Sequence, residues 1–252
     1  MRKSSSSAVL LLASLLASSA FADRYELLVY SDELPKQGEA ELEEVLSLAR
    51  PRDRSAFPSS SLWQSHTELN YGLGKGWEIG LEAHATASGN RTKYGGLAAE
   101  VQYVADQDDN PGWYWGVRLG VGRQASFYEG DWLAAIDINP VIGYRGGNLH
   151  FVLNPSVEIP LGSSDGSTSF QPSAKASWQL NSDGGVGLEY YGDWGKLKSL
   201  TPSRQRAETL YLVWDGRASL GTINVGFGRA LRSGPATPDR WVAKIGVQFD
   251  LD

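Results

Sequence analysis

The chain has 252 residues with 23 basic and 29 acidic side chains, a net charge of −6 and no cysteine. An acidic chain without basic runs argues against nucleic acid as a partner, and the lack of cysteine excludes disulfides and thiolate chemistry. Twenty-nine glycines and nine tryptophans stand beside one methionine, and the mean hydropathy is −0.30. These values exclude a helical membrane protein but not a membrane barrel, whose strands alternate apolar and polar residues.

The first 22 residues have the organisation of a cleaved signal peptide. Arg2 and Lys3 form a positive start, Ala8 to Leu16 is an apolar core, and Ala20-Phe21-Ala22 is a small-x-small cleavage site. The core is shorter than the roughly 20 residues that a helix needs to span a bilayer. We therefore expect residues 1–22 to be removed during secretory export to the bacterial outer membrane. Residues 23–38 are then expected as a periplasmic segment, and residues 39–252 as an outer-membrane barrel.

From Leu62 onward the chain divides into eleven segments of about 10 residues with period-two alternation, separated by turn residues. The short links fall at five places, with longer loops such as Asp193 to Arg206 mostly between them. These links are Gly74 to Gly76, Asp106 to Gly112, Gly146-Gly147, Asn181 to Gly184 and the surroundings of Asp215-Gly216. This pattern predicts an all-β fold: a closed antiparallel transmembrane β-barrel with short periplasmic turns and longer extracellular loops.

A barrel with both termini in the periplasm needs an even number of strands, so we predict twelve, with the first upstream of Leu62. Glu39 to Ala49 is one candidate, with Leu42, Leu46 and Leu48 outward, although Glu44 would then face lipid and the segment also resembles an amphipathic helix. Tyr25 to Tyr30 is the other candidate. Parity permits one of them and not both.

Eight tryptophans share the apolar phase of their strands, mostly near strand ends, where indole rings favour the lipid headgroup level. They are Trp63, Trp77, Trp113, Trp115, Trp132, Trp178, Trp214 and Trp241. In a soluble barrel or sandwich these indoles would have to fit inside the core. The membrane barrel is therefore the better interpretation.

The stretch from His66 to Leu81, HTELNYGLGKGWEIGL, resembles a hairpin that recurs in outer-membrane β-barrel channel proteins of the kind encoded in phenol-degradation operons. The last strand, from Trp241 to Leu251, resembles a barrel-assembly signal, but Phe249 is followed by three further residues where the family ends on an aromatic residue. The resemblance implies a barrel architecture and transport. It implies no catalytic residue and not phenol itself as the solute.

A tight turn that pairs Leu73 with Trp77 would place His66 opposite His84 and Glu68 opposite Glu82 on the polar face. The next hairpins would place Glu100 opposite Arg118 and Lys175 opposite Glu189. The residues that we expect to line the lumen are Glu68, Glu82, Glu100, Arg118, Asp137, Lys175, Glu189, His66 and His84. Three interpretations remain open: a hydrogen-bonded interior, a charged constriction, or a metal site at His66, His84, Glu68 and Glu82.

The sequence offers no catalytic constellation, because no nucleophile can be placed beside a base and an oxyanion donor. We therefore expect no enzyme, no catalytic residue, no resident metal and no cofactor. The preferred function is a passive channel for small solutes. A structural or surface-interaction barrel with a packed lumen is the alternative, and an outer-membrane lipid-modifying enzyme is a third. The expected partners are outer-membrane lipids, the barrel-assembly machinery during insertion and a small solute.

Overall fold

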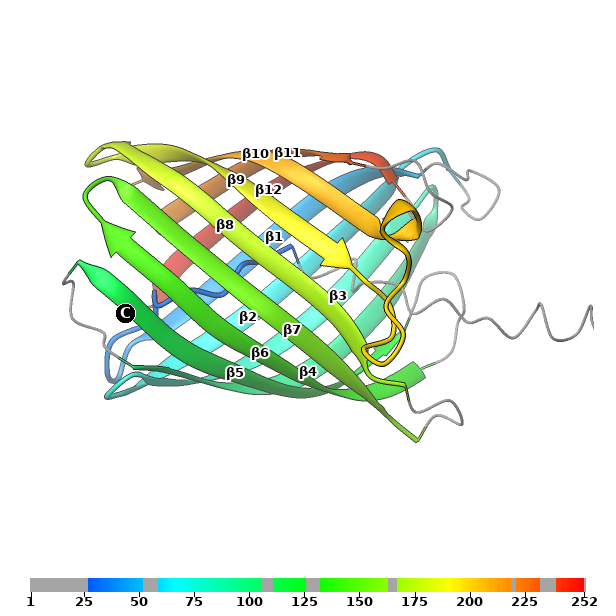
Figure 1. The fold of residues 1–252 in the computed structure, drawn as a ribbon, viewed down its shortest axis with the longest axis horizontal. Helices are drawn as coiled ribbons and strands as arrows, with labels where there is room; N and C mark the ends of the chain where they lie inside the picture. The colour runs from blue at the N-terminus through cyan, green and yellow to red at the C-terminus, as the bar shows by residue number, and fades with distance from the viewer. Residues whose placement is uncertain are drawn as a thin grey trace, which may run out of the picture.

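A computed structural model describes residues 27–51, 59–105, 111–125, 132–162, 167–218, 221–231 and 239–251. Within these ranges twelve antiparallel strands form one closed barrel (Figure 1). The strands are β1 Ala40–Pro51, β2 Leu62–Gly74, β3 Trp77–Ser88, β4 Arg91–Ala105, β5 Gly112–Ala125, β6 Trp132–Gly146, β7 Leu149–Leu161, β8 Ser169–Asn181, β9 Gly184–Asp193, β10 Ala207–Ala218, β11 Gly221–Ala230 and β12 Asp239–Leu251. A short 3-10 helix, η1 Ser203–Gln205, precedes β10. No helix among the described residues is long and apolar enough to cross a membrane.

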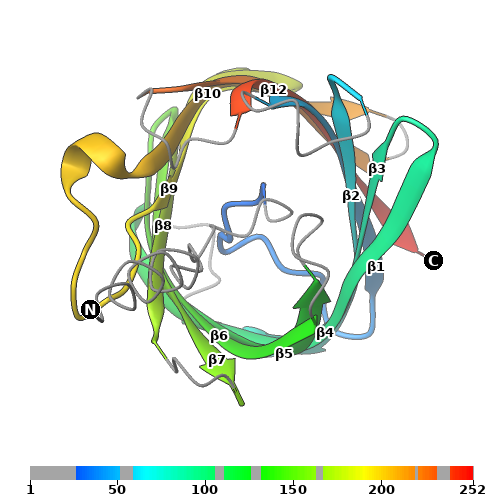
Figure 2. The same cartoon turned by 90° about the vertical axis from the view of Figure 1, so that its right-hand side faces the viewer.

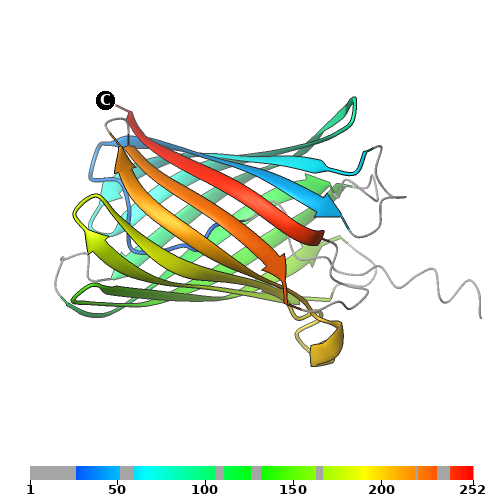
Figure 3. The same ribbon diagram turned by 90° about the horizontal axis from the view of Figure 1, so that it is seen from above.

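Each strand pairs with the next one in the chain, and β12 pairs with β1 to close the barrel (Figure 3). The predicted fold class is therefore confirmed. Closure leaves no exposed sheet edge, which is the condition for a β-structure to lie in a bilayer. The predicted signal peptide lies outside the described residues.

The first strand is β1, so the candidate at Glu39 to Ala49 is confirmed and residues 27–30 form no strand. Its ladder with β2 has no register shift. Glu44 therefore stays in phase with the exposed Leu46 on the outer face. Two hydroxyl groups of β2 compensate its carboxylate: Ser65 Oγ donates over 2.7 Å, and Thr67 Oγ1 donates to the other oxygen.

Connections at the end of the barrel that holds Ala40 and Leu251 are short, and those at the opposite end are mostly longer. The two-residue turn at Gly89 and Asn90 between β3 and β4 is the exception. The turn predicted around Asp215-Gly216 is wrong, because β10 continues to Ala218. Asp215 instead pairs with Asn224 in the ladder to β11. Its carboxylate is bonded within the barrel, and this contact outweighs the turn preference of an Asp-Gly pair.

The outer wall carries the apolar side chains, as the alternation predicted. Six of the eight tryptophans are between 43% and 68% exposed there: Trp63, Trp77, Trp113, Trp115, Trp178 and Trp214. Trp241 is half-buried, and its ring stacks on that of Phe227 with 6.0 Å between the ring centroids. The side chain of Trp132 is not among those described. An apolar outer surface of this extent is what a lipid-facing wall requires.

The inside of the barrel holds residues 27–38, called the N-terminal segment below. Figure 2 shows this blue segment within the ring of strands. Residues 23–38 are predicted as a periplasmic segment ahead of the barrel, but the part that the structure describes, residues 27–38, lies inside the barrel. Apolar packing holds the segment there: Leu27 packs with inner-wall residues that include Val45 and Val213. Val29, Tyr30 and Leu34 pack against a second group of inner-wall residues, Val104, Tyr114, Val141 and Val152.

The N-terminal segment passes very close to Gly72 on β2. Gly38, whose φ is +85°, turns the chain and donates its N–H to the Gly72 carbonyl over 2.9 Å, and Gly72 donates to the Glu39 carbonyl over 3.0 Å. A Cβ atom at Gly72 would meet the carbonyl oxygens of Pro35 and Lys36 at less than 3.0 Å. A glycine is therefore required where the segment bends into the barrel.

Candidate functional site in the barrel lumen

The β2–β5 wall gathers six of the predicted lumen residues into one group, called the acidic cluster below. It consists of Glu68, Glu82, Glu100, Arg118, His66 and His84. All six side chains are at most 8% exposed. The predicted register of β2 and β3 is confirmed here, since Glu68 pairs with Glu82 and His66 with His84. Only the turn differs, because Trp77 pairs with Gly74 after a register shift.

Arg118 on β5 joins the three carboxylates of the acidic cluster. Its Nη2 lies 2.6 Å from Glu68 Oε1 and 3.7 Å from Glu82 Oε2, and it also contacts Glu100. The Tyr30 ring of the N-terminal segment covers the guanidinium, with 3.7 Å between Arg118 Cζ and the ring centroid. The guanidinium thus faces three carboxylates on one side and makes a cation–π contact with the Tyr30 ring on another.

The predicted pairing of Glu100 with Arg118 is wrong by two residues. Arg118 pairs with Gln102, and Glu100 pairs with Gly120. The ion pair forms nevertheless, because the long arginine side chain reaches its diagonal neighbour. A Cβ atom at Gly120 would lie 3.4 Å from Glu100 Oε1 and 3.7 Å from Asp137 Oδ2. Asp137 on β6 is therefore beside this cluster, as expected for a lumen residue.

The two histidines of the acidic cluster lie edge to face, with ring centroids 4.9 Å apart and an interplanar angle of 76°. His66 Nε2 lies 3.3 Å from Glu68 Oε2, and His84 Nε2 bonds Glu82. His66 Nδ1 is buried without a hydrogen-bond partner among the described residues. Nitrogen and carboxylate donors of the types that bind transition metals are thus adjacent on neighbouring strands.

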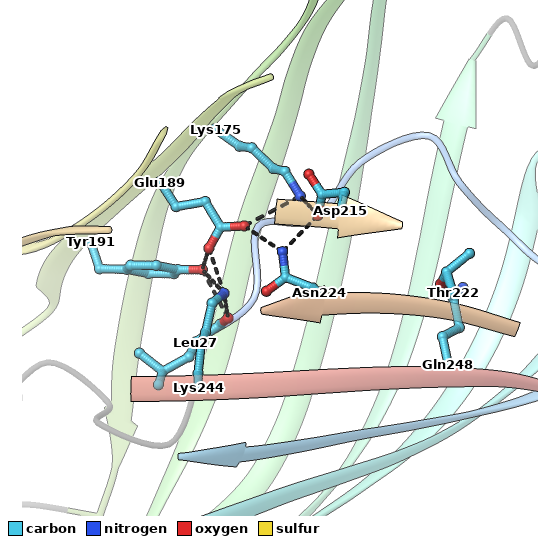
Figure 4. A network of polar contacts seen from close by, with 9 residues as sticks. All are labelled: Leu27, Lys175, Glu189, Tyr191, Asp215, Thr222, Asn224, Lys244 and Gln248. Carbon is cyan, nitrogen blue, oxygen red and sulfur yellow. Dashed lines mark hydrogen bonds and ion pairs between the residues drawn. The ribbon is translucent and has the colours of Figure 1, made fainter. Parts of the chain in front are cut away.

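The opposite wall holds a second group, called the lysine cluster below: Lys175, Lys244, Glu189 and Asp215 (Figure 4). Lys175 Nζ lies 2.7 Å from Asp215 Oδ1 and 3.3 Å from Glu189 Oε1, while Lys244 bonds the second oxygen of Glu189. The Asn224 amide bridges both carboxylates, over 2.6 Å to Asp215 and 3.2 Å to Glu189. Two cations here face two anions, so the cluster is charge-balanced.

The lysine cluster also holds the beginning of the N-terminal segment. The Leu27 carbonyl accepts from Lys244 Nζ over 2.8 Å and from the Tyr191 hydroxyl over 2.8 Å (Figure 4). The Tyr191 hydroxyl also lies 2.8 Å from Glu189 Oε2. The segment is therefore anchored by hydrogen bonds from a buried lysine and a half-buried tyrosine, and not only by apolar packing.

Further along, side chains of β4, β6 and β7 hold the N-terminal segment. Asp32 is 7% exposed; it pairs with Arg145 and lies 3.5 Å from His150 Nε2. Gln102 donates to the Ser31 carbonyl over 2.8 Å, and Asn154 donates to the Tyr30 carbonyl over 3.0 Å. The segment is thus bonded to several walls of the barrel at once.

The wall residues that bond this segment were not among the predicted site residues: Lys244, Tyr191, Gln102, Asn154, Arg145 and His150. Most of them have the polar phase of their strands, which marks an inward position. The pattern contains no signal for what occupies the space in front of them. The alternation of apolar residues at Leu27 and Val29 is the one feature that indicates a segment with a buried face.

No family model matches this chain, and no curated protein matches it by sequence. Among solved structures, an outer membrane channel from Pseudomonas putida F1 is similar with a TM-score of 0.61 and 11% identity, covering 90% of this chain and 100% of that one. The NanC porin has a TM-score of 0.53 and 13% identity, covering 84% of this chain and 100% of that one. The likeness is one of fold. The resemblance to channels from phenol-degradation operons stays a prediction.

Proposed function

We propose that this chain is an outer-membrane β-barrel and a passive channel for small solutes, with its N-terminal segment in the conduction path. The observation that carries the proposal is the closed barrel with an apolar outer wall and charged inner walls. Two neighbouring channels of known structure have this fold. The predicted signal peptide supports export, with lipids and the barrel-assembly machinery as partners.

The proposed orientation places the end with Ala40 and Leu251 in the periplasm. The N-terminal segment then enters the lumen from the periplasmic side, beneath Gly72. The loops from Pro51 to Ser61 and from Asp193 to Arg206 would be extracellular, and the turn from Asp106 to Gly112 would be periplasmic. This assignment follows the usual barrel arrangement of short periplasmic turns and longer outer loops.

A structural barrel with a packed lumen is the second candidate, and one observation favours it. The N-terminal segment is bonded at Leu27, Tyr30, Ser31 and Asp32 to opposite walls of the barrel. A segment fixed at so many points obstructs solute flow. The two candidates differ in whether loosening the segment creates a conducting path.

Single-channel recording in planar bilayers distinguishes these candidates through Gly72→Ala. The added Cβ atom forces the N-terminal segment away from β2 without removing any charged group. We expect rare or small openings in the wild type and a severalfold higher conductance or open probability in the variant. Gly120→Ala is the matched control, because its Cβ atom has 3.4 Å to the nearest side-chain atom. A folded Gly72→Ala protein that stays silent would support the structural barrel.

A further inference from the structure

We propose that His66, His84 and Glu82 form a binding site for a divalent transition-metal ion such as Zn²⁺. One ligand atom from each of these residues lies within 4.8 Å of the other two, and all three residues are buried. The proposed metal site does not depend on whether the barrel conducts, because the pairing of β2 with β3 brings its three ligands together.

The strand geometry produces this set of three ligands. His66 and His84 are direct partners across the β2–β3 ladder, and Glu82 lies two residues from His84 on the same face. Direct cross-strand partners have Cβ atoms about 4.5–5.5 Å apart, and residues i and i+2 of a strand project to the same side. Two adjacent strands thus present three donors toward one point above the sheet.

The donor types suit a metal ion of the zinc group. Two imidazoles and one carboxylate make a three-ligand set that leaves a fourth position for water. Zinc binds such donors at about 2.0–2.2 Å, so the ligand atoms must approach to roughly 3.4 Å from one another. The ligand atoms now lie within 4.8 Å of one another, so binding requires the side chains to approach while the strands hold the three residues in register.

The charge of the surroundings favours a cation. Three carboxylates, Glu68, Glu82 and Glu100, face the single guanidinium of Arg118, and Glu43 pairs with Glu68 across the β1–β2 ladder. Buried charges are normally paired or coordinated to a metal. A divalent ion would offset the excess of negative charge.

Neighbouring side chains can support the ligands from outside. Glu68 Oε2 lies 3.3 Å from His66 Nε2, and Arg118 Nη2 lies 3.7 Å from Glu82 Oε2. Outer-shell partners of this kind orient ligands and raise metal affinity. His66 Nδ1 is buried and has no hydrogen-bond partner among the described residues. A second ring nitrogen is therefore free to take up the metal if Nε2 keeps its contact with Glu68.

The chain is well suited to a test, because it has three histidines and no cysteine. The mature full-length protein, refolded without a polyhistidine tag, is titrated with Zn²⁺ by calorimetry and with Co²⁺ by visible absorption. We expect one equivalent to bind, with cobalt bands typical of four or five ligands. His66→Gln and His84→Gln should each weaken the affinity at least about tenfold, the loss that even an outer-shell change can cause. His150→Gln should bind like the wild type.

X-ray absorption at the zinc edge of the wild-type complex provides a readout that needs no variant. Two imidazole ligands should appear in its outer-shell scattering. Heat-modifiable migration on gels confirms that each variant is folded. Wild-type protein that binds no metal, a spectrum without imidazole, or affinity that survives in both His66→Gln and His84→Gln would overturn the proposal. Loss of binding in His150→Gln would overturn it as well.

Discussion

The two charged clusters of the lumen differ in charge balance although both lie inside one barrel. In the lysine cluster two lysines face two carboxylates, and Asn224, Tyr191 and the Leu27 carbonyl satisfy the remaining hydrogen bonds. In the acidic cluster one arginine faces three carboxylates. The lysine cluster is charge-balanced and anchors the N-terminal segment. The acidic cluster has a single guanidinium for three carboxylates, and its excess of negative charge can attract cations.

Removing the cation of each cluster should therefore have unequal effects. Arg118→Met removes the guanidinium that Glu68, Glu82 and Glu100 share and leaves only the two histidines beside Glu68 and Glu82. We expect the free energy of unfolding to fall by about 3–5 kcal/mol. Lys244→Met should cost less, because Lys175 still lies 3.3 Å from Glu189. Urea unfolding in lipid vesicles, followed by tryptophan fluorescence, measures both. Equal losses would mean that the clusters do not differ in the way described.

The next largest expected effect is the difference in stability between a charge placed on the outer face of the barrel and one placed on the inner face. Leu119 is 43% exposed on the outer face of β5. Leu119→Arg should lower stability by about 2–4 kcal/mol, the cost of a charge at mid-depth in lipid. Ser156→Arg, on the inner face of β7, is the control and should cost less. The same vesicle unfolding assay decides, and equal costs would indicate that the apolar wall does not face lipid.

The smallest expected effect is on ion preference. The unbalanced acidic cluster should make any conducting state prefer cations, because its negative charge raises their local concentration. The preference should be largest at low ionic strength, since salt screens this charge over about 10 Å at 0.1 M. The double variant Glu68→Gln and Glu82→Gln should weaken the preference, as read from reversal potentials in a salt gradient. Glu44→Gln makes the same change on the outer face of β1 and should leave selectivity as it is. Anion preference in the wild type would contradict this assignment.

Alternation predicted the strands, the faces and the closed barrel because a wall with an apolar outer face and a polar inner face imposes one rule on every strand. The register across Gly74 to Gly76 followed from a tight turn, and it placed four of the acidic-cluster residues correctly. The register between β4 and β5 was wrong by two residues, since the link from Asp106 to Gly112 is too long to set it.

The contents of the lumen could not be predicted from alternation. A polar inward residue such as Asn154 reads as a solvated position, yet it is 0% exposed and donates to Tyr30 and Pro140 carbonyls. Of these two partners, Tyr30 lies more than a hundred residues away along the chain. Contacts of that range depend on the packing of Leu27, Val29 and Leu34 against the inner wall, and a single sequence carries no periodic signal for them.

The location of the N-terminal segment is tested most directly by thiol cross-linking. The chain has no cysteine, and Gln102 donates to the Ser31 carbonyl over 2.8 Å. Ser31→Cys combined with Gln102→Cys, treated in vesicles with a short bifunctional methanethiosulfonate, should give an intramolecular cross-link that Gly72→Ala reduces. Ser31→Cys with Ser199→Cys, in the loop before β10, is the control and should give none. Two thiols at 31 and 102 that label singly but never cross-link would contradict a lumen occupied by this segment.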